Sequence, residues 1–330
     1  MPHIFEPHFQ QSRIGLGCMN LSHAYGTPLS ETEALSALRK AFDLGYRHFD
    51  TATLYGKGTN ERLIGKALSD IREDFFLASK CGMAINEEGK KVIDGRPSTL
   101  RQQCEDSLRR LNTDVIDLYY LHRKDPAVDI TESVGALADL MREGKIRSIG
   151  LSEVSAATLT KAHKEAPISA VQSEYSLWTR NPEIAVKDTC QDLGISLVAF
   201  SPLARGFLTA SVCSTEHLVA QDIRLNMPRF QGEHLNNNLK LLTKFQTLAE
   251  SWELSLAQLA LAWVLHQGEH ILAIPGTRSI EHMQDNFTAG NIALTPEQLS
   301  CLNELINQKT VSGPRYNAAQ QQEIDTEEFN

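Results

Sequence analysis

Four ionisable side chains lie in or just after short apolar runs, and their types suit proton transfer to an oxygen. Asp50 lies in RHFDTA and Tyr55 follows it, Lys80 lies in FFLASKCG, and His122 ends LYYLH. A phenol can act as a general acid, and an ammonium beside it favours the phenolate and so lowers the phenol pKa. A carboxylate would hold that ammonium in place, while an imidazole can donate a hydrogen bond to a substrate oxygen. The set predicts proton delivery to an oxyanion that forms on a carbonyl.

Taken singly, each of these residues also has an ordinary structural explanation. An aspartate in a strand usually has a local hydrogen-bond partner, and a lysine at a strand end usually extends its charge to solvent. If both side chains point into one site, however, Asp50 and Lys80 should pair, because an unpaired buried charge is costly. None of the four residues supplies electrons, so a reduction would need a hydride donor, which implies a nicotinamide cofactor.

The elements that must position these residues alternate between short β-rich runs and longer amphipathic stretches. Apolar residues at helical spacing predict helices at 32–44, 61–68, 99–111, 132–142, 158–165, 183–193, 256–266 and 280–288. Strands are predicted at 14–19, 47–52, 75–81, 115–122, 146–152, 169–174, 196–202 and 271–275.

This regular alternation predicts an α/β fold of the (β/α)8 or TIM-barrel type, in which all 330 residues form a single domain. A doubly wound open sheet is the alternative, but GLGCMN at 15–20 keeps only the first two glycines of a dinucleotide turn. A long loop from 204 to about 235 follows the seventh strand, and TPEQL at 295–299 begins an extra C-terminal helix. The polar tail after Gly313 is expected to be loosely held.

Composition excludes several other classes of protein. The net charge of −9 argues against nucleic acid as a partner, and no stretch approaches the length of an apolar membrane span. The six cysteines are scattered without metal-ligand spacing, so we expect reduced thiols and no metal. The N-terminal MPHIFEPHFQ has no signal-peptide pattern, which together with the other features favours a cytoplasmic protein.

The order of these motifs resembles the aldo-keto reductases over roughly residues 15–305. The segments that carry the resemblance are FDTATLYGKGTNERLIGKAL, LASKCG, DLYYLHR, IRSIGLSE, VQSEYSLWTR, AFSPLARGFLTA and IPGTRSIEHMQDNF. The chain is most similar to a bacterial and plant branch that includes perakine-reductase-like enzymes, and more distantly to potassium channel β-subunits. The resemblance implies NADPH-dependent reduction of an aldehyde or ketone, with Asp50, Tyr55, Lys80 and His122 as the catalytic tetrad and Tyr55 as the proton donor.

The resemblance also implies a set of contacts with NADP(H). Ser152 and Gln172 would hold the nicotinamide carboxamide, Phe200 would stack on its ring, and Asp285 and Asn286 would hold the adenine. The pyrophosphate would lie along Ser201, Leu203, Arg205 and Gly206. Gly276 and Thr277 offer backbone N–H groups and a hydroxyl at a helix start, and Arg278 offers a guanidinium for the 2′-phosphate, which favours NADP over NAD.

The substrate is a small carbonyl compound whose identity the sequence leaves open. Large side chains in the loops after strands, or in the long insertion, are candidates for its pocket: Met19, Tyr25, Trp178 and Phe230. Glu153 stands where many relatives have asparagine, and whether it contacts the nicotinamide is also open. A non-enzymatic alternative is an NADPH-sensing regulatory subunit with little turnover. The direction of the reaction in the cell and the oligomeric state are likewise undetermined by the sequence.

Overall fold

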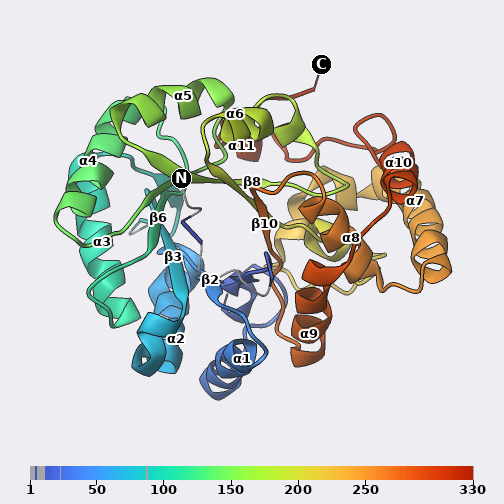
Figure 1. Cartoon of the computed structure of the whole chain (residues 1–330), viewed down its shortest axis with the longest axis horizontal. Coiled ribbons are helices and arrows are strands. Elements are labelled where there is room, and N and C mark those ends of the chain that lie inside the picture. Colours follow the sequence, from blue (N-terminus) through green and yellow to red (C-terminus); the bar gives the residue numbers. More distant parts are fainter. Residues whose placement is uncertain (1–3, 6–11, 23, 87, 330) are drawn as a thin grey trace.

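The computed structural model describes residues 4–5, 12–22, 24–86 and 88–329. Its centre is a sheet of parallel strands in which each strand pairs with the next one along the chain, apart from a short hairpin (Figure 1). The strands of the sheet, in order, are β1 (Leu16–Gly17), β2 (His48–Asp50), β3 (Phe76–Cys81), β6 (Leu118–Leu121), β7 (Ile149–Ser152), β8 (Ile168–Glu174), β9 (Ser196–Phe200) and β10 (Ile271–Ile274).

Backbone hydrogen bonds join the first and last strands and close this sheet into a barrel. The Gly15 N–H donates to the carbonyl of Ala273 at 2.9 Å, and the Ala273 N–H donates to the carbonyl of Arg13 at 3.1 Å. Closure removes both exposed sheet edges, which are otherwise sites of unwanted pairing. The predicted (β/α)8 barrel is therefore confirmed.

Helices surround the barrel, and their apolar faces pack against it (Figure 1). In the first of them, α1 (Glu31–Asp43), the capping box of Ser30 and Glu33 fixes the start, and Ala34, Leu38 and Ala41 lie on the buried face. The helices that follow are α2 (Thr59–Leu68), α3 (Pro97–Leu111), α4 (Ile130–Arg142), α5 (Ala156–Glu165), α6 (Val186–Asp192), α7 (Gly232–Ser251), α8 (Leu256–Leu265), α9 (Ile280–Thr288), α10 (Pro296–Leu305) and α11 (Ala318–Gln321).

Side chains inside the barrel change from apolar to polar toward the ends of the strands. Residues two apart on a strand point to the same face, and the buried cluster that includes Ala78, Leu118 and Ala170 fills the barrel interior. The next inward position on β3 is Lys80, and on β8 it is Gln172. The apolar layers thus form a floor, and the polar groups lie at the C-terminal mouth of the barrel, where barrel enzymes carry their active sites.

Several elements were not predicted from the sequence, among them a hairpin, helix α7 and helix α11. A hairpin of β4 (Met83–Ile85) and β5 (Lys91–Ile93) rises between β3 and α3. The long segment after β9 contains short 3-10 turns at 204–206, 223–226 and 228–230 and then becomes α7 at Gly232, which packs against α10 (Figure 1).

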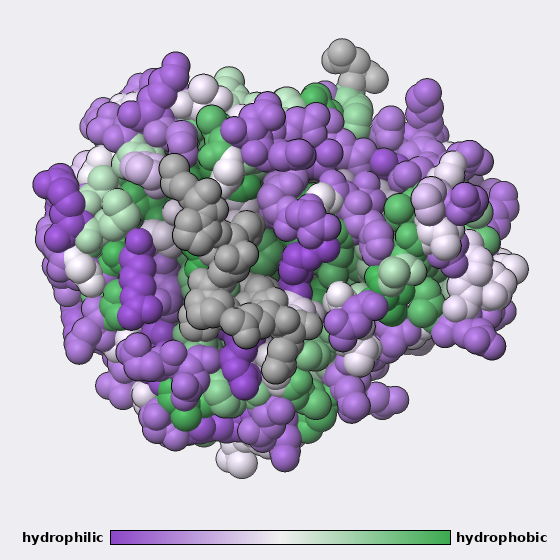
Figure 2. Space-filling model, viewed as in Figure 1, coloured by the Kyte–Doolittle hydropathy of each residue, from purple (hydrophilic) through white to green (hydrophobic). Residues whose placement is uncertain are grey.

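The outer surface is largely hydrophilic in the view of Figure 2, with apolar residues scattered among polar ones. Within the described residues, no helix combines the length and apolar character needed to span a bilayer. Most of the N-terminal stretch that bears on a signal peptide lies outside the described residues, which omit 1–3 and 6–11.

Candidate active site

Asp50, Tyr55 and Lys80 meet at the barrel mouth, as the sequence predicted. The Lys80 ammonium forms an ion pair with Asp50, donates to the Thr51 carbonyl at 2.8 Å and lies 3.5 Å from the Tyr55 hydroxyl. The second Asp50 oxygen accepts a hydrogen bond of 2.8 Å from the Gln172 side chain. All these partners hold the Lys80 ammonium in one position, between the carboxylate and the phenol.

Tyr55 reaches this position through a tight turn. Gly56, Lys57 and Gly58 all have positive φ values, of 56°, 54° and 81°. A side chain at Gly58 would also meet Arg110 at 2.6 Å, so glycine is required there both for its backbone conformation and for space. The turn directs Tyr55 back toward His122, and the two rings meet edge to face with centroids 5.9 Å apart.

Burial and the neighbouring charges together set the pKa of each group in this cluster. Burial raises the pKa of the Tyr55 phenol above its ordinary value, and the positive charge of Lys80 opposes the rise without reversing it. The net shift is therefore opposite to the one expected from Lys80 alone. Burial is the largest influence on Lys80 and lowers its pKa, but the Asp50 carboxylate and the Tyr55 hydroxyl together outweigh it and raise the pKa, so the ammonium stays charged. The Asp50 carboxyl has a raised pKa because it is buried, and Lys80 and Gln172 act against that rise.

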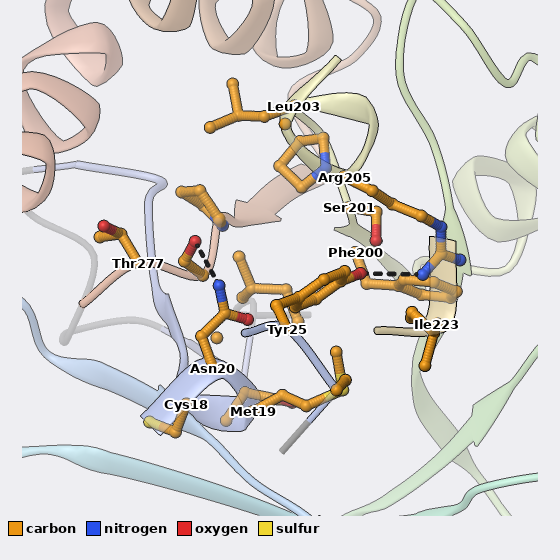
Figure 3. Close-up of a pocket in the computed structure, with 18 of the residues that line it drawn as sticks. Cys18, Met19, Asn20, Tyr25, Phe200, Ser201, Leu203, Arg205, Ile223 and Thr277 are labelled. Atoms are coloured by element: carbon orange, nitrogen blue, oxygen red, sulfur yellow. Dashed lines mark hydrogen bonds between the residues drawn. The ribbon is translucent and has the colours of Figure 1, made fainter. Parts of the chain in front are cut away.

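A cavity of about 1050 Å³ opens from these residues and runs across the mouth of the barrel. Figure 3 shows its walls, in which the loop after β1 faces the loop after β9. Asp50, Tyr55 and His122 lie among the lining residues. Every residue expected to contact the cofactor also lines it, namely Ser152, Gln172, Phe200, Ser201, Leu203, Arg205, Gly206, Gly276, Thr277, Arg278, Asp285 and Asn286.

The far end of the cavity has the chemistry of a nucleotide site. The side-chain amide of Asn286 is buried, and neither its oxygen nor its nitrogen has a hydrogen-bond partner among the described residues. A buried amide without partners is costly, so a ligand edge carrying both a donor and an acceptor, such as adenine, would satisfy it. Nearby, Thr277 and Arg278 precede α9, whose N-terminus favours an anion. The residues present therefore fit an adenine dinucleotide.

Arg205, expected to lie along the pyrophosphate, lines the cavity and also has partners within the protein. Its guanidinium donates to the Tyr25 hydroxyl at 3.0 Å (Figure 3), forms an ion pair with Glu174 at 2.7 Å and donates to the Tyr316 hydroxyl at 3.0 Å. These contacts link the loops around the cavity, while the Nε atom of Arg205 is buried without a hydrogen-bond partner among the described residues. Its positive φ of 57° belongs to the turn that carries Leu203 and Gly206 to the cavity wall.

Two of the four candidates for the substrate pocket line the cavity, and two do not. Met19 and Tyr25 face into it (Figure 3). Trp178 is buried elsewhere, stacked on Phe207 with centroids 4.1 Å apart and edge-on to Phe230. Neither Trp178 nor Phe230 is among the described residues that line the cavity. A large apolar residue in a loop is as readily used to anchor that loop, and sequence offers no signal that separates the two roles.

The tail after Gly313 is firmly docked, which corrects the expectation that it is loosely held. Arg315 is 3% exposed and forms ion pairs with the buried carboxylates of Glu153 and Glu174. Further along, Asp325 pairs with Lys124 at 2.8 Å. Glu153 is thus occupied by Arg315 and by the backbone N–H of Glu174, and it is not among the described residues lining the cavity.

Docking of the tail places residues in the cavity wall that sequence reasoning missed. Tyr316, Gln320, Glu323 and Ile324 line the cavity, together with Met83 and Lys91 of the β4–β5 hairpin. The one signal in the sequence was Glu153 itself, which directly follows an apolar strand, since a buried glutamate requires a cation from some other part of the chain.

The closed parallel barrel, with a tyrosine, a lysine, an aspartate and a histidine at its mouth, is what the resemblance to the aldo-keto reductases predicted. A comparison with family models gives the same family. The model of the aldo/keto reductase family matches residues 13–307. The protein belongs to this family. It is 42% identical over 309 residues to a probable aldo-keto reductase 1 of Glycine max, covering 93% of this chain and 89% of that protein.

Solved structures show the same likeness. The glycerol dehydrogenase of Gluconobacter oxydans superposes with a TM-score of 0.84 at 28% identity, covering 93% of this chain and 95% of that one. An aldo/keto reductase of Klebsiella pneumoniae, in complex with NADP and acetate, gives a TM-score of 0.70 at 27% identity and covers 92% and 94% of the two chains.

Proposed function

We propose that this protein reduces an aldehyde or ketone to an alcohol with NADPH, and that Tyr55 donates the proton. The observation that carries the proposal is the ordered contact of Asp50 with Lys80 and of Lys80 with the Tyr55 hydroxyl, at the wall of a cavity large enough for a dinucleotide. Family membership and relatives solved with NADP and with NADPH support it.

The cofactor supplies hydride when it is bound, and the residues of this chain supply position and proton. Ser152 and Gln172 would hold the carboxamide, and the ring face of Phe200 would support the nicotinamide. Ser201, Leu203 and Gly206 would follow the pyrophosphate, Gly276, Thr277 and Arg278 the 2′-phosphate, and Asp285 and Asn286 the adenine. Arg205 would act here by fixing the turn rather than by touching phosphate.

Proton transfer follows from the properties of Tyr55. Its raised pKa keeps the phenol protonated near neutrality, as a general acid must be. As negative charge develops on the substrate oxygen and the proton moves, the Lys80 ammonium at 3.5 Å stabilises the phenolate that remains. His122, whose ring meets that of Tyr55, would orient the carbonyl by donating a hydrogen bond.

The variant Tyr55→Phe tests this assignment. It should bind NADPH as the unchanged protein does and lose about 10²-fold or more in kcat on an activated aldehyde such as 4-nitrobenzaldehyde. Near-normal turnover by Tyr55→Phe would refute the role of Tyr55. Tight NADPH binding with no turnover by the unchanged protein on a broad panel of carbonyl compounds would instead support an NADPH-sensing regulatory subunit.

A further inference from the structure

A second cation lies in the catalytic mouth, and the proposed reaction leaves it without a role. Arg123 directly follows His122 and lines the cavity beside Tyr55. One nitrogen of its guanidinium, Nη1, donates to the His122 carbonyl at 2.6 Å and to the Ser152 hydroxyl at 3.2 Å. These two bonds fix the side chain across the end of β7.

The remaining side of this guanidinium lacks a counter-charge. Its Nε atom is buried and has no hydrogen-bond partner among the described residues. Within the same part of the chain, no carboxylate lies within ion-pair distance of Arg123, whereas Arg205 pairs with Glu174 and Lys80 pairs with Asp50. Arg123 is half-buried, and a partly desolvated cation without an anion is costly, so Arg123 is suited to a negative group that arrives from outside the chain.

The charged groups that face Arg123 reinforce this assignment. Burial lowers the pKa of Arg123, with Arg205 acting in the same direction, while Tyr316, Tyr55 and Glu323 partly offset the effect. Of these groups, Glu323 is the one carboxylate, and it forms an ion pair with Lys91 of the hairpin. The charge of Glu323 is therefore balanced by Lys91, and the charge of Asp50 is balanced by Lys80. Arg123 remains as a positive charge without a counter-ion beside the reacting groups.

We propose that Arg123 binds a carboxylate on the carbonyl substrate, so that the preferred substrates are aldehydes or ketones that carry an acid group. A guanidinium is the side chain best matched to a carboxylate, because its planar fork can donate two parallel hydrogen bonds. The inference rests on the proposed function, since it names the substrate class of the same site. Arg123 is a specificity residue here, while proton transfer stays with Tyr55.

The first test compares 4-carboxybenzaldehyde with 4-formylbenzamide, which has nearly the same shape and no charge. The unchanged protein should have the higher kcat/KM for the acid. Arg123→Gln should lower the acid-to-amide ratio of kcat/KM by about tenfold or more, mainly through the KM for the acid, as expected for loss of a charge-assisted hydrogen bond. Arg123→Lys should restore part of the ratio. Lys164→Gln removes the same charge from an exposed position of α5 outside the cavity and should leave the ratio unchanged.

The second test needs no turnover and separates this inference from the proposed reaction. Calorimetry would measure benzoate binding to the protein saturated with NADP⁺. Benzoate should bind to the unchanged protein and about tenfold or more weakly to Arg123→Gln. Benzoate binding that depends on Arg123, in a protein that reduces no member of the broad carbonyl panel, would refute the reductase and keep the anion site.

Other outcomes overturn the role of Arg123. One is an acid-to-amide ratio that does not change in Arg123→Gln. Another is an equal loss for both aldehydes together with weaker NADPH binding, because Arg123 would then act by holding Ser152 against the nicotinamide. Benzoate binding that is the same in both proteins would likewise refute the carboxylate site.

Discussion

Replacing Lys80 with methionine should destabilise the fold by leaving a buried carboxylate without its cation. Asp50 is 2% exposed, and its remaining partner would be the Gln172 amide at 2.8 Å. Removing one member of a buried ion pair costs about 3–5 kcal/mol. With an unfolding entropy of roughly 2.1 cal/mol/K per residue, the 330 residues give about 0.7 kcal/mol/K. Lys80→Met should therefore lower the thermal midpoint by about 4–7 °C at neutral pH.

The loss of stability in Lys80→Met should also depend on pH, in a direction set by the pKa of Asp50. Burial already raises the pKa of Asp50, and loss of Lys80 removes the largest opposing effect, so the folded-state pKa rises further above its unfolded value of about 3.9. A folded-state pKa that is raised means that the folded protein binds the extra proton. The free energy of unfolding then falls as pH rises from about 4 through that pKa. The deficit of Lys80→Met relative to the unchanged protein should be smaller at pH 5 than at pH 8.

Calorimetric melting at both pH values measures this deficit, and a double variant provides the control. Asp50→Asn/Lys80→Met carries no buried charge at the pair and keeps an amide to bond with Gln172. It should recover at least half of the lost midpoint at pH 8. A deficit that is equal at the two pH values, or a double variant no more stable than Lys80→Met, would refute the argument from the unpaired carboxylate.

Two further predictions concern the phosphate site and the tail. Arg278→Gln should weaken NADPH binding by up to about tenfold while changing NADH binding little, because the exposed guanidinium, which also donates to the Thr27 carbonyl, would meet no part of the cofactor other than the 2′-phosphate. Fluorescence titration with both cofactors checks this, and equal changes would contradict it. Arg315→Met should leave Glu153 buried and unpaired, and so speed protease cleavage after residue 315. Glu153→Gln/Arg315→Met should be cleaved more slowly than Arg315→Met, and cleavage equal to that of the unchanged protein in both variants would exclude an anchoring role.

The barrel and the catalytic cluster could be predicted from sequence because both depend on short-range patterns. Alternating apolar runs and helical stretches imply strands and helices, and strand ends converge at one mouth. The sequence therefore predicts that Asp50, Lys80 and Tyr55 lie close together. The sign of the Tyr55 pKa shift was not accessible, because it depends on how completely the phenol is buried, and burial is a property of the whole fold.

The contacts of the tail could not be predicted because they join distant parts of the chain. Arg315 and Glu153 are 162 residues apart, and no periodicity links them. Helix α7 was missed for a different reason: its sequence GEHLNNNLKLLTKFQTLAES begins with a glycine and three asparagines, which have low helix propensity. Of the apolar residues that bury its face, Leu235 alone lies in the first half, and Leu242, Phe245 and Ala249 come later.

The docked tail also has a consequence for how this protein is made. The four residues of the proposed tetrad and the strands that carry them are complete by residue 122, and the barrel can close once β10 has formed. The buried Glu153, however, has no counter-ion until Arg315 has been made, and part of the cavity wall comes from Tyr316 and Ile324. Until residues 315–324 have emerged from the ribosome, the nascent barrel holds an acid without its counter-ion and a pocket with one side open. The pocket should thus be completed only after this segment has been made and docked.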